Sequence, residues 1–409
     1  MSGPRIPDDA GWTCRQLTSG TAEGRFHQHS YYDIAIFDRE SRRIAAYGMD
    51  FMNRDVTAED VVQVGYVDLG DGDAFVPLGE SRAFSLQQGP MAQWIAGTRR
   101  MIWNDRENGA FYARIHDIDD GATRTLPCPI YAVAPDGATG LSLDMARLDG
   151  LRPGYGYTGT GGGQLEERCP DDEGVWKVDL ATGDRRLILS LAAARDFVLP
   201  RLGLGRIEHA LKRYHYWFNH AKISPDGTRF TVKFRWKERG EPWYVKMSVS
   251  LTARLDGGGL SFVAKGASHV LWEDPQTLFY HALGPLRLER GRPRRGPGWV
   301  RRVRDTPGRS TQQGDLGRRF IGGNAHVRKI PGTDGLFVHD TPYRAEIDLA
   351  LYDEPTDTSR VIATFTGHGP AGGGPYRCDL HSVPSPDGRH IVVTSLVDGG
   401  RQLYLLTRD

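Results

Sequence analysis

Three copies of a Pro-Asp-Gly turn, each set between an apolar run and an alternating run, limit what this chain can fold into. They lie at residues 135–137, 225–227 and 386–388, within YAVAPDGATGLSL, HAKISPDGTRFTVKFRW and HSVPSPDGRHIVVTSL. Proline presets φ for the first position of the turn and glycine tolerates positive φ, so each copy predicts a β-hairpin. Apolar residues alternate after the turn, as at Phe230 and Val232, which is typical of half-buried strands.

Weaker copies of the same pattern begin near Tyr31, Gln93, His269 and His326, which brings the number of expected hairpins to seven. Most are followed by a second alternating pair, such as GVWKVDLATGDRRLILSL, giving about four strands per unit. This repeat predicts an all-β fold, a seven-bladed β-propeller. Stacking the blades in a ring buries faces that no blade can bury alone. A pair of β-sandwiches is the structural alternative.

The repeat runs through most of the chain, so we expect residues 1–409 to form a single domain. WTCRQLT, residues 12–18, is expected to pair with the C-terminal QLYLLTRD as the outer strand of the last blade and so to close the ring. Two insertions interrupt the period. One, near residues 151–216, carries helical spacing, and the other, near residues 286–320, is an arginine-rich loop. Long loops in compact folds are usually functional or disordered, so a substrate wall and a mobile loop are both open.

The charge of the chain limits its partners. A formal net charge of +1 with 25% charged residues argues against general nucleic-acid binding, which needs a broad basic surface. Any preference for polyanions must therefore be local. The sequence has neither a signal-peptide pattern nor an apolar run of membrane-spanning length, so we expect a cytoplasmic protein with no membrane partner. Its oligomeric state is left open.

Histidines recur where successive blades are expected to begin. His220 and His381 each stand five residues before the proline of a Pro-Asp-Gly turn, His326 stands five before Pro331, and His269 precedes a similar turn. Strand starts converge at the channel of a propeller, so we expect these imidazoles to face one cavity. Neutral imidazole is a common ligand of divalent metals, which makes His269, His326 and His381, with Cys378 nearby, candidate ligands of a manganese or zinc ion. The alternatives are that the imidazoles are hydrogen-bonding spacers and that Cys378 is a small buried hydrophobe.

Other polar residues are expected near the same entrance. The segment KRYHYWFNH ahead of the fourth turn holds groups that bind an anion or move a proton, and LRPGYGY and QQGPMAQW offer a phenol and an amide. Arg213, Tyr216 and His29, with His220, are the candidate catalytic residues. The candidate substrate-binding residues are His215, Asn219, Tyr155 and Gln93.

The segments FNHAKISPDGTRF, ASHVLWED and RCDLHSVPSPDG resemble those of oligogalacturonate lyases and related seven-bladed propeller polysaccharide lyases. The resemblance implies a divalent metal, typically manganese, held by histidines and a glutamine at the channel mouth. His269 resembles one such ligand and His381 matches another. Cys378 stands where the glutamine is expected and Val383 replaces a second histidine, so this chain departs from the family's ligand set.

The resulting hypothesis is a lyase that cleaves uronic-acid-containing oligosaccharides by metal-assisted β-elimination, with His220 as the base and Tyr216 or His29 as the acid. A metal or an arginine is expected to neutralise the uronate carboxylate, so that the C5 proton becomes removable. The rivals are a non-catalytic propeller that binds a protein or glycan partner and a glycoside hydrolase on the same scaffold, which requires paired carboxylates.

Overall fold

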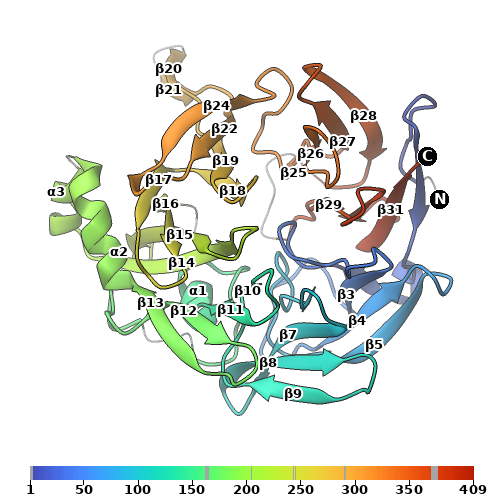
Figure 1. Cartoon of the computed structure of the whole chain (residues 1–409), viewed down its shortest axis with the longest axis horizontal. Coiled ribbons are helices and arrows are strands. Elements are labelled where there is room, and N and C mark those ends of the chain that lie inside the picture. The colour runs from blue at the N-terminus through green and yellow to red at the C-terminus, as the bar shows by residue number, and fades with distance from the viewer. Residues whose placement is uncertain are drawn as a thin grey trace.

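The computed structural model describes residues 3–161, 165–203, 205–242, 244, 246–289, 292–369 and 376–409, without the side chains of 287, 289 and 292–295. Within these residues the chain forms seven sheets of four or five strands and one two-stranded sheet. The seven larger sheets are arranged around a central axis as the blades of a propeller (Figure 1). The all-β, seven-bladed fold predicted from the sequence is therefore confirmed.

The first three blades follow chain order from the inner strand outward. Blade 1 consists of β2 (Phe26–Gln28), β3 (Arg43–Met49), β4 (Val62–Asp68) and β5 (Ala74–Ser81). Blade 2 consists of β6 (Gln93–Trp94), β7 (Arg100–Glu107), β8 (Ala110–Asp117) and β9 (Thr123–Leu126). Blade 3 consists of β10 (Ala132–Val133), β11 (Thr139–Ser142), β12 (Gly174–Asp179) and β13 (Arg185–Ser190).

The last four blades include the two interruptions of the repeat. Blade 4 consists of β14 (Tyr214–Ile223), β15 (Arg229–Glu238), β16 (Met247–Arg254) and β17 (Ser261–Lys265), with β23 (Gly308–Arg309) added in parallel. Blade 5 consists of β18 (Ser268–Trp272), β19 (Thr277–Ala282), β22 (Trp299–Arg304) and β24 (Thr311–Leu316). Blade 6 consists of β25 (Val327–Lys329), β26 (Leu336–Asp340), β27 (Ile347–Asp353) and β28 (Thr358–Phe365). Blade 7 consists of β29 (Val383–Pro384), β30 (His390–Ser395), β31 (Gln402–Arg408) and, from the other chain end, β1 (Trp12–Gln16).

The helical segments lie mainly between blades 3 and 4. They are η1 (Thr21–Glu23), α1 (Met145–Leu151), α2 (Leu191–Val198), η2 (Leu199–Leu202) and α3 (Gly205–Leu211). None of the helices in the described part of the chain has the length and apolarity needed to cross a membrane. The helical spacing expected near residues 151–216 ends earlier, with α3 at Leu211, because Tyr214–Ile223 joins blade 4 as a ten-residue strand.

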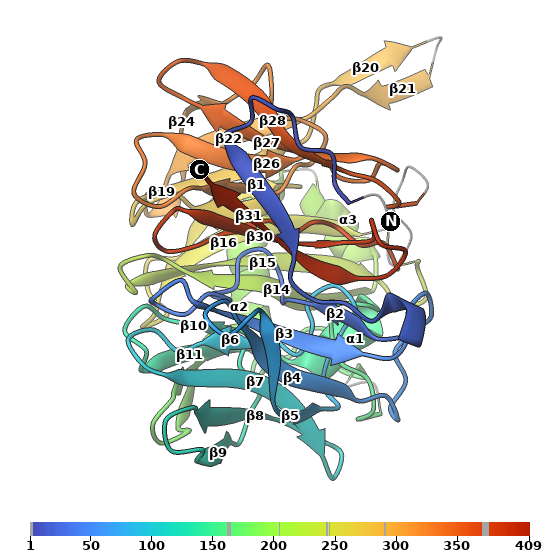
Figure 2. The same cartoon turned by 90° about the vertical axis from the view of Figure 1, so that its right-hand side faces the viewer.

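The arginine-rich stretch is predicted from the sequence as one loop insertion, but in the structure it forms several strands. Its beginning forms a hairpin of β20 (Leu286–Glu289) and β21 (Arg292–Arg295), which Figure 2 shows projecting beyond the blades. The rest supplies the blade strands β22 and β24. In β22 Val300 and Val303 are buried, whereas Arg302 forms ion pairs with Glu273 and Glu354. An arginine on this strand is thus paired with acidic residues that are distant in sequence, which allows an arginine-rich segment to form part of a blade.

The N-terminal strand closes the ring as the sequence predicts. β1 pairs antiparallel with β31 from Trp12 opposite Arg408 to Gln16 opposite Tyr404. The strands nearest the two chain ends, β1 and β31, therefore lie side by side in the last blade (Figure 2).

Turns of neighbouring blades pack directly on one another. A Cβ added at Gly137 would lie 2.4 Å from the carbonyl oxygen of Ala96 in the turn of blade 2, and one at Gly388 would lie 2.3 Å from that of Pro331 in blade 6. Both glycines also have positive φ. Glycine is therefore required at the last residue of the Pro-Asp-Gly turn for two reasons, its backbone conformation and the lack of space for a Cβ.

Candidate functional site

Four histidines occupy the same structural position in four consecutive blades. In every blade the first hairpin is closed by a backbone N–H that donates across the turn, as from Ser224 to Arg229 and from Ser385 to His390. The residue four positions before that donor is histidine in blades 4 to 7 and an apolar residue in blades 1 to 3. In blade order these residues are Ile34, Met91, Ile130, His220, His269, His326 and His381.

Three of these histidines have a backbone conformation that is rare for residues with a side chain. The φ angles of His220, His269 and His381 are 54°, 48° and 47°. The pairing of β14 shifts register between Asn219 and Lys222, and that of β18 shifts between Ser268 and Leu271, so His220 and His269 lie within bulges. Bulges re-aim side chains, and positive φ in non-glycine residues is concentrated at functional sites. The local backbone therefore supports a functional origin for the repeated histidine.

The four imidazoles surround Tyr31 and Tyr32, which come from the loop after β2. The His269 and His326 rings lie 4.4 Å apart between centroids, and the His326 and His381 rings lie 4.9 Å apart. Tyr31 stacks on His220 at 5.3 Å and meets His381 edge-on at 4.6 Å. These contacts bring residues of blades 4 to 7 together with a segment near the N-terminus.

Burial controls the protonation of this cluster. It lowers the pKa of His220, His269 and His381 well below the ordinary value, so these rings are neutral at pH 7. Burial also acts to lower the pKa of His326, but the Asp340 carboxylate outweighs it and raises that pKa. His326 and Asp340 are both buried, and their Nδ1 and Oδ2 atoms are 2.8 Å apart.

Several buried polar atoms of the cluster have no hydrogen-bond partner among the described residues. They are the Tyr32 hydroxyl, Nδ1 of His220, Nδ1 of His269 and Nε2 of His381. Leaving such an atom unsatisfied costs free energy, so their concentration at one point favours a bound ligand or ion there.

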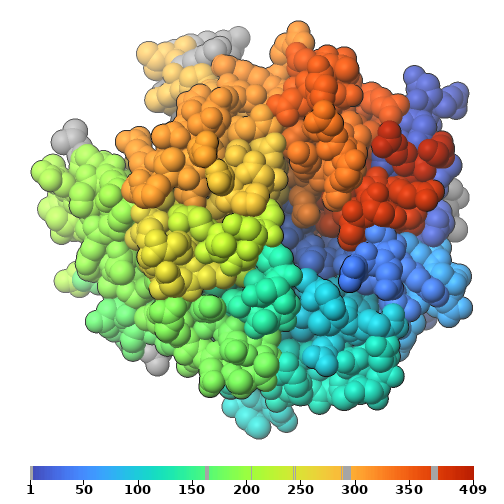
Figure 3. All heavy atoms as spheres, viewed as in Figure 1, coloured from blue at the N-terminus to red at the C-terminus, as the bar shows by residue number. Residues whose placement is uncertain are grey.

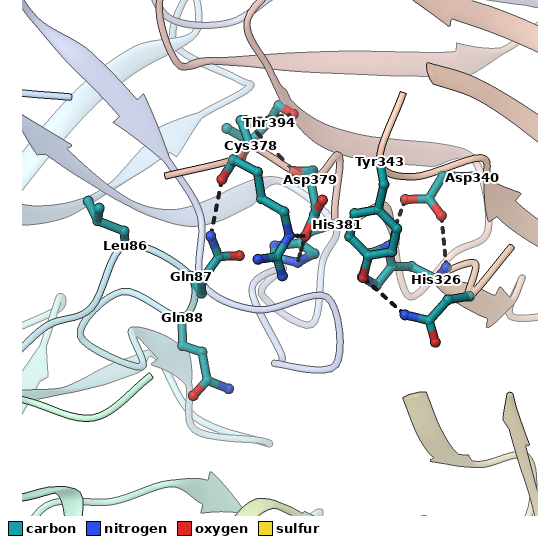
Figure 4. Close-up of polar contacts among 12 residues, drawn as sticks. Leu86, Gln87, Gln88, His326, Asp340, Tyr343, Cys378, Asp379, His381 and Thr394 are labelled. Atoms are coloured by element: carbon teal, nitrogen blue, oxygen red, sulfur yellow. Dashed lines mark hydrogen bonds and ion pairs between the residues drawn. The ribbon is translucent and has the colours of Figure 1, made fainter. Parts of the chain in front are cut away.

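One group of side chains has the spacing of a metal site. Ligand atoms of His326, Asp379 and His381 all lie within 4.8 Å of one another, and all three residues are buried. The Asp340 carboxylate at Nδ1 of His326 leaves Nε2 available to an ion, which is the usual arrangement behind a metal-bound histidine. Figure 4 shows Asp340 on the far side of His326 from Asp379 and His381. Two imidazoles and one carboxylate form a donor set that divalent transition metals accept.

Two of the metal ligands expected from the sequence lie outside this group. The Cys378 thiol lies 3.8 Å from the carbonyl oxygen of Asp379 and 3.7 Å from that of Thr394, and burial raises its pKa to about 11. His269 touches His326 ring to ring but supplies no atom to the group. Asp379 joins this group although the sequence did not indicate it, because residues 377–382 lie outside regular strands and His381 has a positive φ, so alternation does not predict side-chain direction there.

A cavity of about 920 Å³ opens beside the histidines. Tyr31, Tyr155, His220 and His269 contribute to its wall. Leu283, which precedes the β20–β21 hairpin, borders it. The β20–β21 hairpin projects from the face that points away from the viewer in Figure 3. The face that Figure 3 shows is hollowed near its centre as well. No Asp or Glu is found among the described lining residues, whereas seven cationic side chains are: Arg152, Lys222, Lys233, Arg235, Lys246, Lys265 and Arg377. Lys222 is paired with Asp33 and Arg377 with Asp379, and burial lowers the pKa of Lys246 to about 6, so part of this basic set is charge that a ligand would meet.

Tyr155 lies between two guanidinium groups in this cavity. Arg377 donates from Nη2 to its hydroxyl over 3.1 Å, and Arg152 covers its ring at 4.4 Å. Burial acts to raise the pKa of Tyr155, but Arg377 and then Arg152 outweigh it and lower that pKa. The ring also meets His220 edge-on at 5.6 Å, so a phenol of enhanced acidity adjoins a neutral imidazole.

The other expected site residues do not line the cavity. Asn219 is buried and accepts from Nε of Arg235 over 2.9 Å, which fixes a guanidinium of the wall. Gln93 donates to the carbonyl of Met91, and His29 is buried against the carbonyl of Ser30. Burial lowers the pKa of His29 to about 4.

Three more expected residues lie at the other end of the segment that leads to His220. Arg213 is exposed just before β14, His215 contacts the carbonyl of Leu165, and the Tyr216 hydroxyl lies 2.7 Å from Nδ1 of His209. Their closeness to His220 in sequence is not closeness in space, because four to seven extended residues span about 13–23 Å.

The fold and the cavity together define a seven-bladed β-propeller with a cationic, histidine-lined central site. Among solved structures, an oligogalacturonate lyase in complex with manganese matches with a TM-score of 0.61 and 14% sequence identity, covering 99% of this chain and 96% of that chain. An oligogalacturonate lyase from Vibrio parahaemolyticus matches with a TM-score of 0.57 and 12% identity, again covering 99% and 96%. Comparison with protein-family models gives no match, and neither does comparison with curated proteins. The likeness to oligogalacturonate lyases predicted from the sequence is thus confirmed at the level of the fold.

Proposed function

We propose that this protein is a lyase that cleaves uronic-acid-containing oligosaccharides by β-elimination. The observation that carries the proposal is the cavity itself, where seven basic side chains and no described carboxylate adjoin a neutral imidazole and an acidified phenol. A glycoside hydrolase needs a pair of carboxylates at the bond it cleaves, which the described wall does not offer. The fold shared with oligogalacturonate lyases is consistent with the proposal.

β-Elimination first requires that the uronate carboxylate be neutralised. Lys233 and Arg235, on the strand paired with the His220 segment, line the cavity and act electrostatically on His220. A carboxylate bound between them has its charge offset, which makes the proton at C5 easier to remove. The same carboxylate reduces the positive potential on His220 and raises its pKa toward the range in which an imidazole works as a base.

Proton transfer is then assigned to His220 and Tyr155. His220 takes the C5 proton, because its ring is neutral and its Nδ1 is free of hydrogen bonds within the described structure. Tyr155 delivers a proton to the departing O4, a role for which guanidinium neighbours that increase its acidity are suitable. Tyr155 replaces Tyr216 and His29 as the proposed acid, since neither lines the cavity.

His326, Asp379 and His381 are the residues that would hold a divalent metal. Such an ion would supply Lewis-acid stabilisation of developing negative charge. With Cys378 outside the group, the nitrogen and oxygen donors suit manganese as well as zinc.

His220→Asn tests the proposal, because asparagine tolerates the positive φ of this position but removes the base. The double bond formed between C4 and C5 is conjugated with the carboxylate and absorbs in the ultraviolet. We expect the wild-type protein to raise this absorbance with at least one oligosaccharide from a panel of galacturonate and glucuronate substrates. We expect His220→Asn to lower the rate by about a hundredfold to ten-thousandfold.

His116→Asn is the matched control, since His116 lies on β8, contacts the hydroxyl of Thr123 on β9 and does not line the cavity. It should retain the wild-type rate, and both variants should keep the wild-type melting temperature within a few degrees. If the products are saturated sugars, the reaction is hydrolysis and the lyase proposal is wrong. Binding without turnover would favour the non-catalytic alternative.

A further inference from the structure

A second basic groove lies next to the cavity, and nothing in the proposed reaction uses it. It has a volume of about 480 Å³ and is bordered by η2, β17, β19 and β22. Its cationic side chains are Arg201, Lys265, Arg301 and Arg309, and no Asp or Glu is found among its described lining residues. Phe262 and Tyr280 provide an apolar floor.

The groove is continuous with the cavity through Lys265. This residue ends β17 and lines both hollows. β17 runs on into the groove, where Phe262 pairs in parallel with Arg309 of β23. A basic surface therefore extends from His220, across Lys265, to Arg309.

The positions of these cations are largely fixed by the fold. Arg201 donates from Nη1 to the carbonyl of Phe197 over 2.6 Å and lies 3.6 Å from the centre of the Phe197 ring. Arg301 lies 3.5 Å from Asp315 and packs over Trp299. Among the described residues Arg301 has an acidic partner, whereas Arg201, Lys265 and Arg309 have none, so the charges of three of the four cations are not offset within the protein.

We propose that this groove binds the additional uronate residues of a longer oligosaccharide whose cleaved linkage lies in the cavity. The inference rests on the proposed function and specifies its substrate as a polyanion of more than two sugars. Separate carboxylates along one chain match separate cations along one surface, whereas a single small anion would occupy only the cavity.

The test compares digalacturonate with tetragalacturonate in the wild-type protein and in the double variant Arg201→Gln, Arg309→Gln. We expect the double variant to lower kcat/KM for the tetrasaccharide by about tenfold, the loss of roughly 1.4 kcal/mol of binding, through KM and with kcat unchanged. The disaccharide should be cleaved with wild-type constants. Arg304→Gln is the control, because Arg304 is on β22 but bonds to Gln276 outside the groove.

Equal effects on both substrates, or no effect on either, would overturn the inference. If neither sugar is cleaved, equilibrium binding of the same two sugars separates the two proposals. If the tetrasaccharide binds more tightly than the disaccharide and the double variant loses this difference, the groove proposal stands although the lyase proposal has failed. Binding without any dependence on length would exclude the groove.

Discussion

Lys233 lies in an environment that suits the binding of an anionic ligand better than it suits the stability of the ligand-free protein. Its side chain is 7% exposed and has neither an ion pair nor a hydrogen bond within the described structure. Burial lowers its pKa well below the ordinary value, and Arg235 and Lys222 lower it further. A buried cation without a partner is costly, and anionic ligands are what would offset it.

We therefore predict that Lys233→Met stabilises the ligand-free protein at pH 7 by about 1–3 kcal/mol while weakening its binding of uronates. The pH dependence has a definite sign. The unfolded chain binds the proton up to the ordinary pKa of lysine, whereas the folded chain releases it at lower pH. Wild-type stability consequently rises with pH across that interval, and the variant should lack this rise.

Denaturant unfolding at several pH values measures both effects. Lys329→Met, at an exposed position on β25, is the control and should leave stability and its pH dependence unchanged. A destabilised Lys233→Met would show that the side chain contributes mainly to packing.

At this scale the sequence was informative about the histidines and less so about their neighbours. The distance of His220 and His381 from the turn fixes their register, so their common position could be predicted. Tyr31 and Tyr32 reach the cluster from an irregular loop, where periodicity gives no side-chain direction. The same limit explains why Asp379, rather than Cys378, joins the metal-site group.

Among the elements, β12 follows a half-buried acidic residue, Glu173, that lies near the helical insertion. Glu173 accepts from Nε1 of Trp176 over 3.1 Å, and its other oxygen has no partner in the described structure. Burial raises its pKa to about 7, and the nearby Asp144, which caps α1, raises it as well.

Glu173→Gln should stabilise this region in alkaline but not in acidic solution. Between pH 4.5 and about 7 the folded chain keeps the proton that the unfolded chain loses, so wild-type stability falls as pH rises through this window. Glutamine preserves the acceptor for Trp176 and removes the fall, so we expect a gain on the order of 2 kcal/mol at pH 8 and none at pH 4. Melting curves at both pH values, with exposed Asp172→Asn as the control, check this. A gain that is the same at both pH values would contradict it.

The proposed metal group joins two elements, because His326 precedes β25 of blade 6 and His381 precedes β29 of blade 7. An ion held there would stabilise the folded state by roughly 2.7 kcal/mol at a hundred times its Kd. We predict that manganese or zinc raises the melting temperature and that His381→Ala and Asp379→Ala abolish the rise. Cys378→Ser should preserve it. Elemental analysis of the purified protein complements the melts, and the absence of both bound metal and a melting shift would remove the metal from the proposal.

Elements marked by turns were predictable, whereas elements stabilised by distant partners were not. The Pro-Asp-Gly turns place three hairpins in the structure at the residues where the sequence predicts them. β22 was assigned to an insertion because its alternation is masked by arginines. Their partners, Glu273 and Glu354 for Arg302, lie in other parts of the chain.

The whole molecule depends on a closure that joins its two ends. Leu17 donates its backbone N–H to the carbonyl of Leu403, and the Thr18 hydroxyl donates to Oε1 of Gln402 over 2.7 Å. These contacts extend the pairing of β1 with β31, and Trp12 is 3% exposed within the core of blades 6 and 7. A ring without this strand leaves β31 as an open edge in the last blade.

Deleting residues 1–18 should therefore open the ring, and the effect should be largest far from the deletion in sequence. We expect amide protection in β31 and β30 to fall, because β31 loses its outer hydrogen bonds and the apolar cover of Trp12. Trp12→Ala keeps the backbone pairing and should cost about 3–5 kcal/mol, so the two variants separate strand pairing from core packing. Hydrogen exchange resolved by segment provides the measurement, with β7 and β8 of blade 2 as an internal reference. A deletion of residues 1–4, which leaves β1 intact, is the control. Unchanged protection in β31 after the longer deletion would mean that blade 7 is held by its neighbours alone, and uniform loss across all blades would mean that closure governs the stability of the entire propeller.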